Sequence, residues 1–143
     1  MVIGYPEGPV MIYYLDSCTV LFMLKDPKQT TMDIISSISS KNIKIPSMVK
    51  AELITGAYKS HDVEDNMNKT KRFLDPYEVI PFDEDASEIY GKIRAEMEAK
   101  GKSIGANDMV IAATVLSRGG TLVTSDTKEF GRVEGLRIEN WCK

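Results

Sequence analysis

The stretch that decides the fold is Val10-Met11-Ile12-Tyr13-Tyr14-Leu15-Asp16, a run of largely apolar residues that stops at a carboxylate. Val10 to Leu15 is too short for a helix and lacks the alternation of a half-exposed strand. It therefore predicts a parallel strand that is buried on both faces. Asp16 then lies at the carboxyl end of this strand, where ligands bind in open α/β sheets.

Downstream of Asp16, predicted helices and strands alternate. The alternation predicts an α/β fold with a mainly parallel central sheet flanked by helices. Further strands are predicted over Ile43 to Pro46, Glu78 to Phe82, Thr121 to Thr124 and Leu136 to Trp141. Helices are predicted over Ser17 to Leu24, Gln29 to Ser40, Met48 to Tyr58 with Ser47 as its cap, Val63 to Leu74, Asp83 or Asp85 to Gly101, and Gly105-Ala106-Asn107 to Gly119-Gly120.

Length and composition limit the architecture to one domain. The chain has 143 residues, of which 43% are hydrophobic and 27% charged, the balance of one ordinary globular domain. Residues 1–10 are rich in glycine and proline, so we predict a flexible extension that precedes a single domain over residues 11–143. No apolar run approaches the roughly 18 residues of a membrane span, which predicts a cytoplasmic protein.

The charges and the scarce metal-binding side chains narrow the function. A formal net charge of -3 excludes a globally basic coat for nucleic acids. The two cysteines, Cys18 and Cys142, form no CxxC motif, and His61 is the single histidine. A zinc site or a histidine pair is therefore not expected, and any catalysis must depend on carboxylates.

Four acidic residues are candidates for this role. Asp16 and Asp126 each follow a predicted strand, Asp108 opens a predicted helix, and Glu52 lies on the apolar stripe of another. Singly, each has an ordinary explanation as a turn, cap or solvated residue. Together they form a set of hard oxygen ligands of the kind that holds Mg²⁺ or Mn²⁺.

The acidic residues lie in motifs that resemble those of PIN-domain nucleases, and more narrowly those of VapC-type toxins. The resemblance spans Met11 to Trp141 and departs from the family pattern at Cys18, where asparagine is usual. The motifs are Leu15-Asp16-Ser17, Val49-Lys50-Ala51-Glu52-Leu53-Ile54-Thr55-Gly56, Ile104-Gly105-Ala106-Asn107-Asp108-Met109-Val110-Ile111-Ala112-Ala113 and Leu122-Val123-Thr124-Ser125-Asp126.

This resemblance implies a PIN-like fold and a homodimeric endoribonuclease that depends on Mg²⁺ or Mn²⁺ and is inhibited by a small VapB-like antitoxin. It places Asp16, Glu52, Asp108 and Asp126 at the metal, with the hydroxyls of Ser17 and Thr124 beside it. The expected reaction is cleavage of RNA phosphodiesters by a metal-activated water.

Two other functions stay open on the sequence. An aspartate after an apolar strand is also found in haloacid-dehalogenase-like phosphatases, but these carry a second acid two positions later, where this chain has Cys18. A PIN-like binding module without catalysis is the second alternative. The presence of all four acidic positions favours the nuclease.

Overall fold

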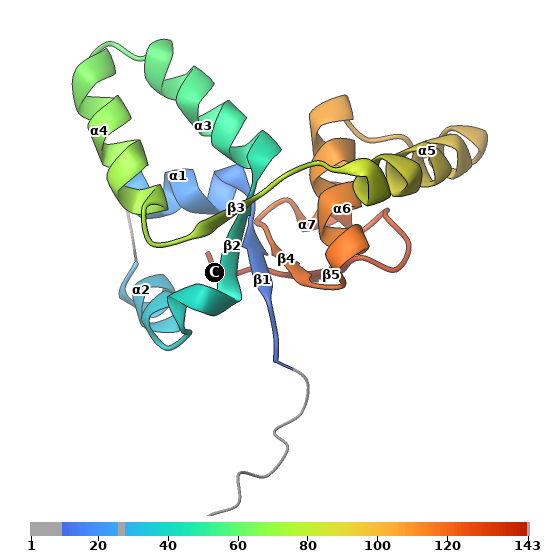
Figure 1. Cartoon of the computed structure of the whole chain (residues 1–143), viewed down its shortest axis with the longest axis horizontal. Helices are drawn as coiled ribbons and strands as arrows, with labels where there is room; N and C mark the ends of the chain where they lie inside the picture. The colour runs from blue at the N-terminus through green and yellow to red at the C-terminus, as the bar shows by residue number, and fades with distance from the viewer. Residues whose placement is uncertain (1–9, 26–27, 143) are drawn as a thin grey trace, which may run out of the picture.

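The computed structural model describes residues 10–25 and 28–142 as a five-stranded sheet with helices on both sides (Figure 1). The predicted extension lies, apart from Val10, outside the described residues. The strands are β1 (Tyr13–Leu15), β2 (Ile43–Pro46), β3 (Glu78–Ile80), β4 (Thr121–Val123) and β5 (Arg137–Glu139). The helices are α1 (Ser17–Lys25), α2 (Gln29–Ser36), η1 (Ser40–Asn42), α3 (Ser47–Tyr58), α4 (Val63–Leu74), α5 (Glu84–Ala99), α6 (Ala106–Arg118) and α7 (Thr127–Phe130).

All paired strands run parallel, in the order β3-β2-β1-β4-β5. The predicted α/β fold with a mainly parallel sheet is therefore confirmed. β1 is the central strand, and the chain continues first to β2 on one side of it and later to β4 on the other. This change of direction creates a topological switch point between β1 and β4, the position at which open α/β sheets bind ligands.

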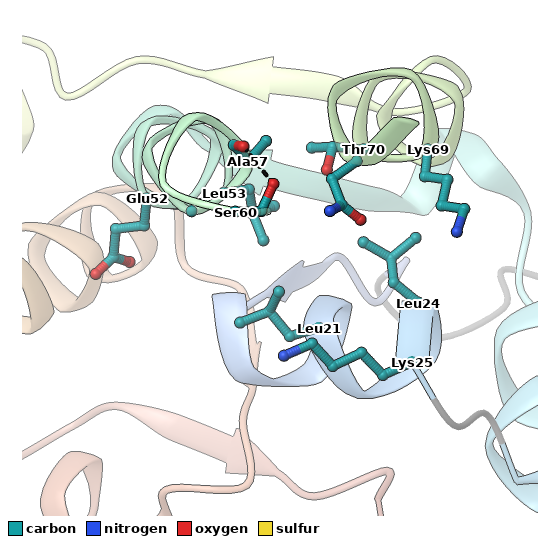
Figure 2. Close-up of a pocket in the computed structure, with 11 residues that line it drawn as sticks. Leu21, Leu24, Lys25, Glu52, Leu53, Ala57, Ser60, Lys69 and Thr70 are labelled. Carbon is teal, nitrogen blue, oxygen red and sulfur yellow. Dashed lines mark hydrogen bonds between the residues drawn. The ribbon is translucent and has the colours of Figure 1, made fainter. Parts of the chain in front are cut away.

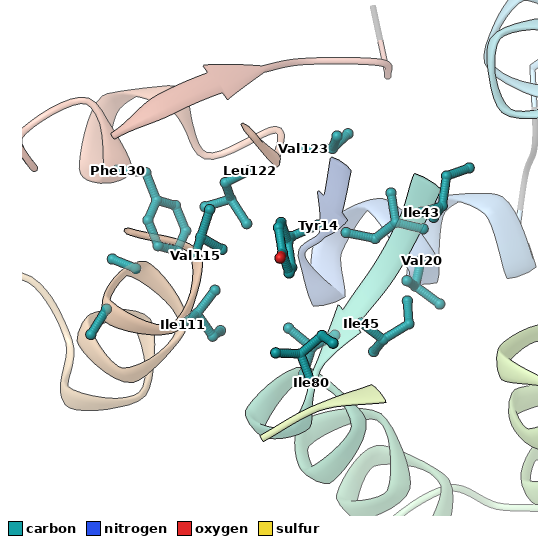
Figure 3. Close-up of a cluster of buried hydrophobic side chains, with 14 of the residues drawn as sticks. Tyr14, Val20, Ile43, Ile45, Ile80, Ile111, Val115, Leu122, Val123 and Phe130 are labelled. Atoms are coloured by element: carbon teal, nitrogen blue, oxygen red, sulfur yellow. The ribbon is translucent and has the colours of Figure 1, made fainter. Parts of the chain in front are cut away.

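The core lies on both faces of β1, as the apolar run predicts. Tyr14 and Leu15 are buried, and Figure 3 shows Tyr14 between Val115 and Leu122 on one side and Ile45 on the other. The helices α3 and α4 pack together at one end of the molecule, and α5 packs on α6 at the other (Figure 1). None of the helices in the described part of the chain combines the length and hydropathy that a membrane span requires.

Several predicted element ends are wrong by a few residues. The helix predicted to reach Ser40 ends at Ser36, because the hydroxyls of Ser36 and Ser37 donate to the carbonyls of Met32 and Ile34 and so compete with the helical bonds. The strands predicted to begin at Val10, to end at Phe82 and to end at Trp141 are all shorter in the structure. Each is hydrogen-bonded only over the short register that it shares with its neighbouring strand.

The starts of three helices, α3, α5 and α6, differ in how they are capped. Pro46, rather than Ser47, is the residue before α3, so β2 passes directly into this helix without a side-chain cap. Of the two predicted caps of α5, Asp83 is the one that caps the helix, with its Oδ1 accepting a hydrogen bond from the Ala86 N–H at 3.0 Å. α6 follows Gly105 and ends at Gly119, whose φ of 76° is the left-handed conformation that glycine adopts most easily.

Candidate active site

Asp16 is the buried carboxylate at the end of the central strand. Its side chain accepts hydrogen bonds from the backbone N–H of Ser17 at 2.8 Å, from the hydroxyl of Thr124 at 2.8 Å and from the thiol of Cys18 at 3.2 Å. With a relative exposure of only 4%, the carboxylate depends on these donors to offset its lost hydration. The three donors fix its orientation toward the β1–β4 edge.

Thr124 links the ends of β1 and β4. Its hydroxyl donates to Asp16 and accepts a hydrogen bond from the Asp126 N–H at 3.0 Å. The backbone N–H of Ser125 donates to the sulfur of Cys18 at 3.4 Å. One threonine thus bridges two of the predicted site residues.

Asp126 begins the short helix α7, which the sequence analysis missed. Its Oδ1 caps the helix by accepting a hydrogen bond from the backbone N–H of Glu129 at 3.2 Å. The Glu129 side chain crosses to the start of α6, where it accepts from the Gly105 N–H at 2.9 Å. Glu129 thereby joins the predicted carboxylates although it was not among them.

Asp108 lies in the first turn of α6, close to other carboxylates of the site. Burial, the charge of Glu129 and the charge of Asp16 together raise the pKa of Asp108 to about 7. Oxygen atoms of Asp108, Asp126 and Glu129 lie within 4.8 Å of one another. We call these three residues the acidic trio.

Glu52 approaches the cluster from α3. It accepts a hydrogen bond at 3.3 Å from the hydroxyl of Ser17, whose backbone N–H donates to Asp16. Burial raises the pKa of Glu52, an effect that the Ser17 hydrogen bond opposes and the Asp16 charge reinforces. Asn107 also offers its side chain to this carboxylate. Glu52 lies beside the acidic trio without belonging to it.

The donor set suits a hard divalent cation. The acidic trio offers only carboxylate oxygens, which are the ligands preferred by Mg²⁺ and Mn²⁺. Three carboxylates this close repel one another, as the raised pKa of Asp108 records. A bound cation would relieve that repulsion, so the residues present fit the predicted metal.

Two depressions flank Glu52 on either side of α3. The first, which we call the groove, has a volume of about 480 Å³ and runs between α1, α3 and α4. Figure 2 shows Leu21, Leu24 and Lys69 along it and the Glu52 carboxylate pointing away from them. The second, which we call the hollow, has about 390 Å³ and extends from Glu52 to Lys59 and Asn107.

Comparison with known proteins finds the PIN domain over residues 13–136. A relative from Rickettsia felis, named Ribonuclease VapC2, is 37% identical over 134 residues, which cover 93% of this chain and all of that protein. A relative from Salmonella typhimurium, named tRNA(fMet)-specific endonuclease VapC, is 35% identical and covers 91% of this chain and 98% of its own.

A solved structure gives the same result at the level of the fold. The DNA-bound VapBC complex from Salmonella typhimurium contains a chain that superposes with a TM-score of 0.88 at 36% identity. The superposition covers 92% of the present chain and 99% of that one. The predicted PIN-like architecture is thereby confirmed.

Proposed function

This chain belongs to the PIN domain family, and we propose that it is a divalent-metal-dependent endoribonuclease that serves as the toxin of a VapBC-type toxin–antitoxin pair. The observation that carries the proposal is the convergence of Asp108, Asp126 and Glu129 beside the buried Asp16, at the switch point of a parallel sheet. This convergence places a cation-binding charge where the fold binds ligands.

In the proposed mechanism the acidic trio and Asp16 would hold a divalent cation such as Mg²⁺ or Mn²⁺, with Glu52 beside it. A bound divalent ion supplies Lewis acidity, which lowers the pKa of an attacking water and offsets the charge of the phosphodiester. Thr124 and the thiol of Cys18 keep the Asp16 carboxylate oriented. Glu52 accepts a hydrogen bond from the Ser17 hydroxyl, which holds its carboxylate close to Asp16.

RNA is the proposed substrate, because the relatives are named as ribonucleases and two of them as tRNA(fMet)-specific endonucleases. That tRNA is the first substrate to test. Purified protein incubated with it in Mg²⁺ or Mn²⁺ is expected to give discrete fragments with 5′-phosphate ends, and none in EDTA. Hydrolysis of a small phosphate ester without RNA cleavage would instead indicate the phosphatase, and neither activity a binding module.

The proposed partner is a small VapB-like antitoxin, and the groove is a suitable place for it. Leu21 is 40% exposed there, with Leu24 beside it, so an apolar helix face of a partner has a surface to cover. The groove ends at Glu52, so a basic side chain of the same partner can reach the carboxylates. The homodimer that the family resemblance implies stays a prediction, testable by sedimentation.

A further inference from the structure

We propose that the hollow between α3 and the start of α6 is a subsite for single-stranded RNA, which receives the nucleotide next to the phosphate that is cleaved. In this subsite Lys59 contacts a neighbouring phosphate and the wall of α3 packs against the base. The inference rests on the proposed ribonuclease function and adds to it the residues that hold the flanking nucleotide.

The hollow is continuous with the acidic cluster. Glu52 lines it at one end and also accepts the hydrogen bond from Ser17, while Asn107 precedes Asp108 in the chain. Its volume of about 390 Å³ falls in the range of small-molecule sites, roughly 300 to 1,000 Å³. An RNA strand whose phosphate is at the carboxylates therefore has this hollow directly beside it.

One face of α3 forms the wall of the hollow. Met48, Glu52, Thr55 and Lys59 follow one another at steps of three or four residues, the repeat of a single helix face. Lys59 lies two turns beyond Glu52, a rise of about 10 Å. The lysine thus lies toward the far end of the hollow from Glu52, a position that suits contact with a neighbouring phosphate of the same strand.

Lys59 carries a positive charge that can attract an anionic substrate to the acidic site. Its side chain is exposed and, among the residues that the structure describes, makes no ion pair. Phosphate contacts from lysine provide most of the affinity of proteins for nucleic acid strands. The unpaired cation favours RNA as the occupant of the hollow over an apolar peptide.

Gly56 adds an independent indication that something approaches α3 from outside. A Cβ atom added at this position would meet no other atom within 4 Å, so the packing of the protein does not require glycine. Glycine weakens a helix interior relative to alanine, which makes its use here costly. Gly56 lines both the groove and the hollow, so a ligand in either depression, such as a flat base in the hollow, can lie close against the α3 backbone.

The charge of Lys59 is tested by the salt dependence of RNA binding. Lys59→Gln and the control Lys50→Gln, which changes the same charge on α3 but outside both depressions, are compared with their parent. Binding of a labelled single-stranded RNA is measured in Mg²⁺ in an Asp108→Asn background. Log affinity decreases with log salt, and we expect Lys59→Gln to make this negative slope shallower by about 0.7, the value of one phosphate contact. The slope should stay unchanged for Lys50→Gln. Equal slopes in all three proteins would overturn the proposal.

The shape of the hollow is tested by filling it. Ala51 is exposed and lines the hollow but not the groove, so Ala51→Trp closes the hollow while Lys50→Trp serves as a control of equal size. We expect RNA affinity to fall about tenfold or more in Ala51→Trp alone, at an unchanged melting temperature.

The outcomes separate this inference from the proposed function. Wild-type protein that cleaves RNA, together with an Ala51→Trp variant of unchanged RNA affinity, overturns the subsite and leaves the ribonuclease intact. An Ala51→Trp variant that binds RNA normally but escapes its protein inhibitor assigns the hollow to the inhibitor, which also overturns the subsite. Wild-type protein that neither binds nor cleaves RNA refutes the proposed function itself.

Discussion

Asp108 is the residue at which burial and neighbouring charge act together most strongly. Replacing it by asparagine keeps the shape of the side chain but removes its charge, so metal binding should weaken. We expect RNA cleavage by Asp108→Asn to fall on the order of 100-fold to 1,000-fold or more. The metal-free protein should melt at a higher temperature, because repulsion with Glu129 and Asp16 is relieved.

The matched control for Asp108→Asn is Asp85→Asn, which removes an exposed acidic residue from the first turn of α5. Both variants lose a carboxylate near a helix N-terminus, but only one lies in the acidic trio. Cleavage by gel assay and melting in EDTA distinguish them. Full activity of Asp108→Asn would contradict the proposed metal site.

The raised pKa of Asp108 also predicts how pH acts on the metal-free protein. Its folded value of about 7 lies above an unfolded value of about 3.9, so the folded state binds the extra proton between these limits. Stability should therefore fall as pH rises from about 4 to 7, by on the order of 1 kcal/mol, since the half-exposed group is screened by solvent.

Denaturant unfolding in EDTA at several pH values measures this dependence, and Asp108→Asn should flatten it relative to the parent. In the same pH range the affinity for Mn²⁺ should rise with pH, because the cation and the proton compete for the carboxylate. A Mn²⁺ affinity that is constant between pH 5 and 8 would argue against Asp108 as a ligand.

Glu129 is the residue of the site that the sequence analysis missed. Glu129→Gln keeps an oxygen for the Gly105 N–H but removes a charge from the acidic trio. We expect Mn²⁺ affinity, measured by calorimetry, to fall at least about tenfold, and the pKa of Asp108 to decrease because the charge of Glu129 helps to raise it. Glu134→Gln, an exposed change in the following loop, is the control, and equal affinities would exclude Glu129 from the metal site.

At the scale of elements, the helices that the sequence predicted well are long enough for their hydrophobic pattern to repeat or have a strong N-terminal cap. α4 has the predicted bounds, and α5 is capped by Asp83, one of its two predicted caps, because both helices have several turns over which the pattern repeats. α7 has four residues, too few to show a hydrophobic period, so the sequence did not predict this helix. Glu129 lies in it and was therefore not recognised as a site residue. Asp126-Thr127-Lys128-Glu129 does have the spacing of a capping box, the one local signal that could have found it.

The contacts between the site residues depend on the order of the strands in the sheet, not on local sequence patterns. Asp16, Asp108 and Asp126 could be assigned to strand or helix ends from local pattern, but their contacts depend on strand order. The order β3-β2-β1-β4-β5 brings the ends of β1 and β4 together across more than 100 residues of chain. No local pattern encodes the Thr124 hydroxyl that joins Asp16 to the Asp126 backbone.

Gly120, which lies between α6 and β4, and Gly56 in α3 should respond to alanine in opposite directions. At Gly120, an added Cβ would lie 2.3 Å from the Tyr14 ring and 2.9 Å from the Ile12 carbonyl oxygen, so Gly120→Ala must displace the central strand. We expect it to cost about 2 kcal/mol or more of unfolding free energy. Gly56→Ala meets no atom and should stabilise α3 by up to about 1 kcal/mol. Urea denaturation measures both, and a neutral Gly120→Ala would contradict the packing described for β1.

At the scale of the whole molecule, the central sheet separates two tasks. The end of the molecule that contains α1, α3 and α4 presents the groove, and the start of α6 with α7 presents the acidic trio. Glu52 on α3 stands between them and lines the groove. An inhibitor that docks in the groove can therefore reach the carboxylates from the side of Glu52 without covering the acidic trio.

This arrangement predicts that inhibitor and metal compete. A groove-bound antitoxin that places an arginine or lysine among the carboxylates gains charge pairing and relieves their repulsion, as a cation does. We expect expression of this chain alone to slow growth, and co-expression of the adjacent small open reading frame to restore it. Raising Mg²⁺ should weaken the purified complex, and Asp108→Asn should reduce this Mg²⁺ sensitivity.

The measurement is a titration of the complex at several Mg²⁺ concentrations at constant ionic strength, which separates competition from screening. Leu21→Asp in the groove provides the comparison, since it should weaken the complex at every Mg²⁺ concentration and leave RNA cleavage unchanged. Affinity that depends on neither Mg²⁺ nor Asp108 would refute competition at the carboxylates. It would leave the groove as the only point of attachment, and inhibition would then have to act by keeping RNA away.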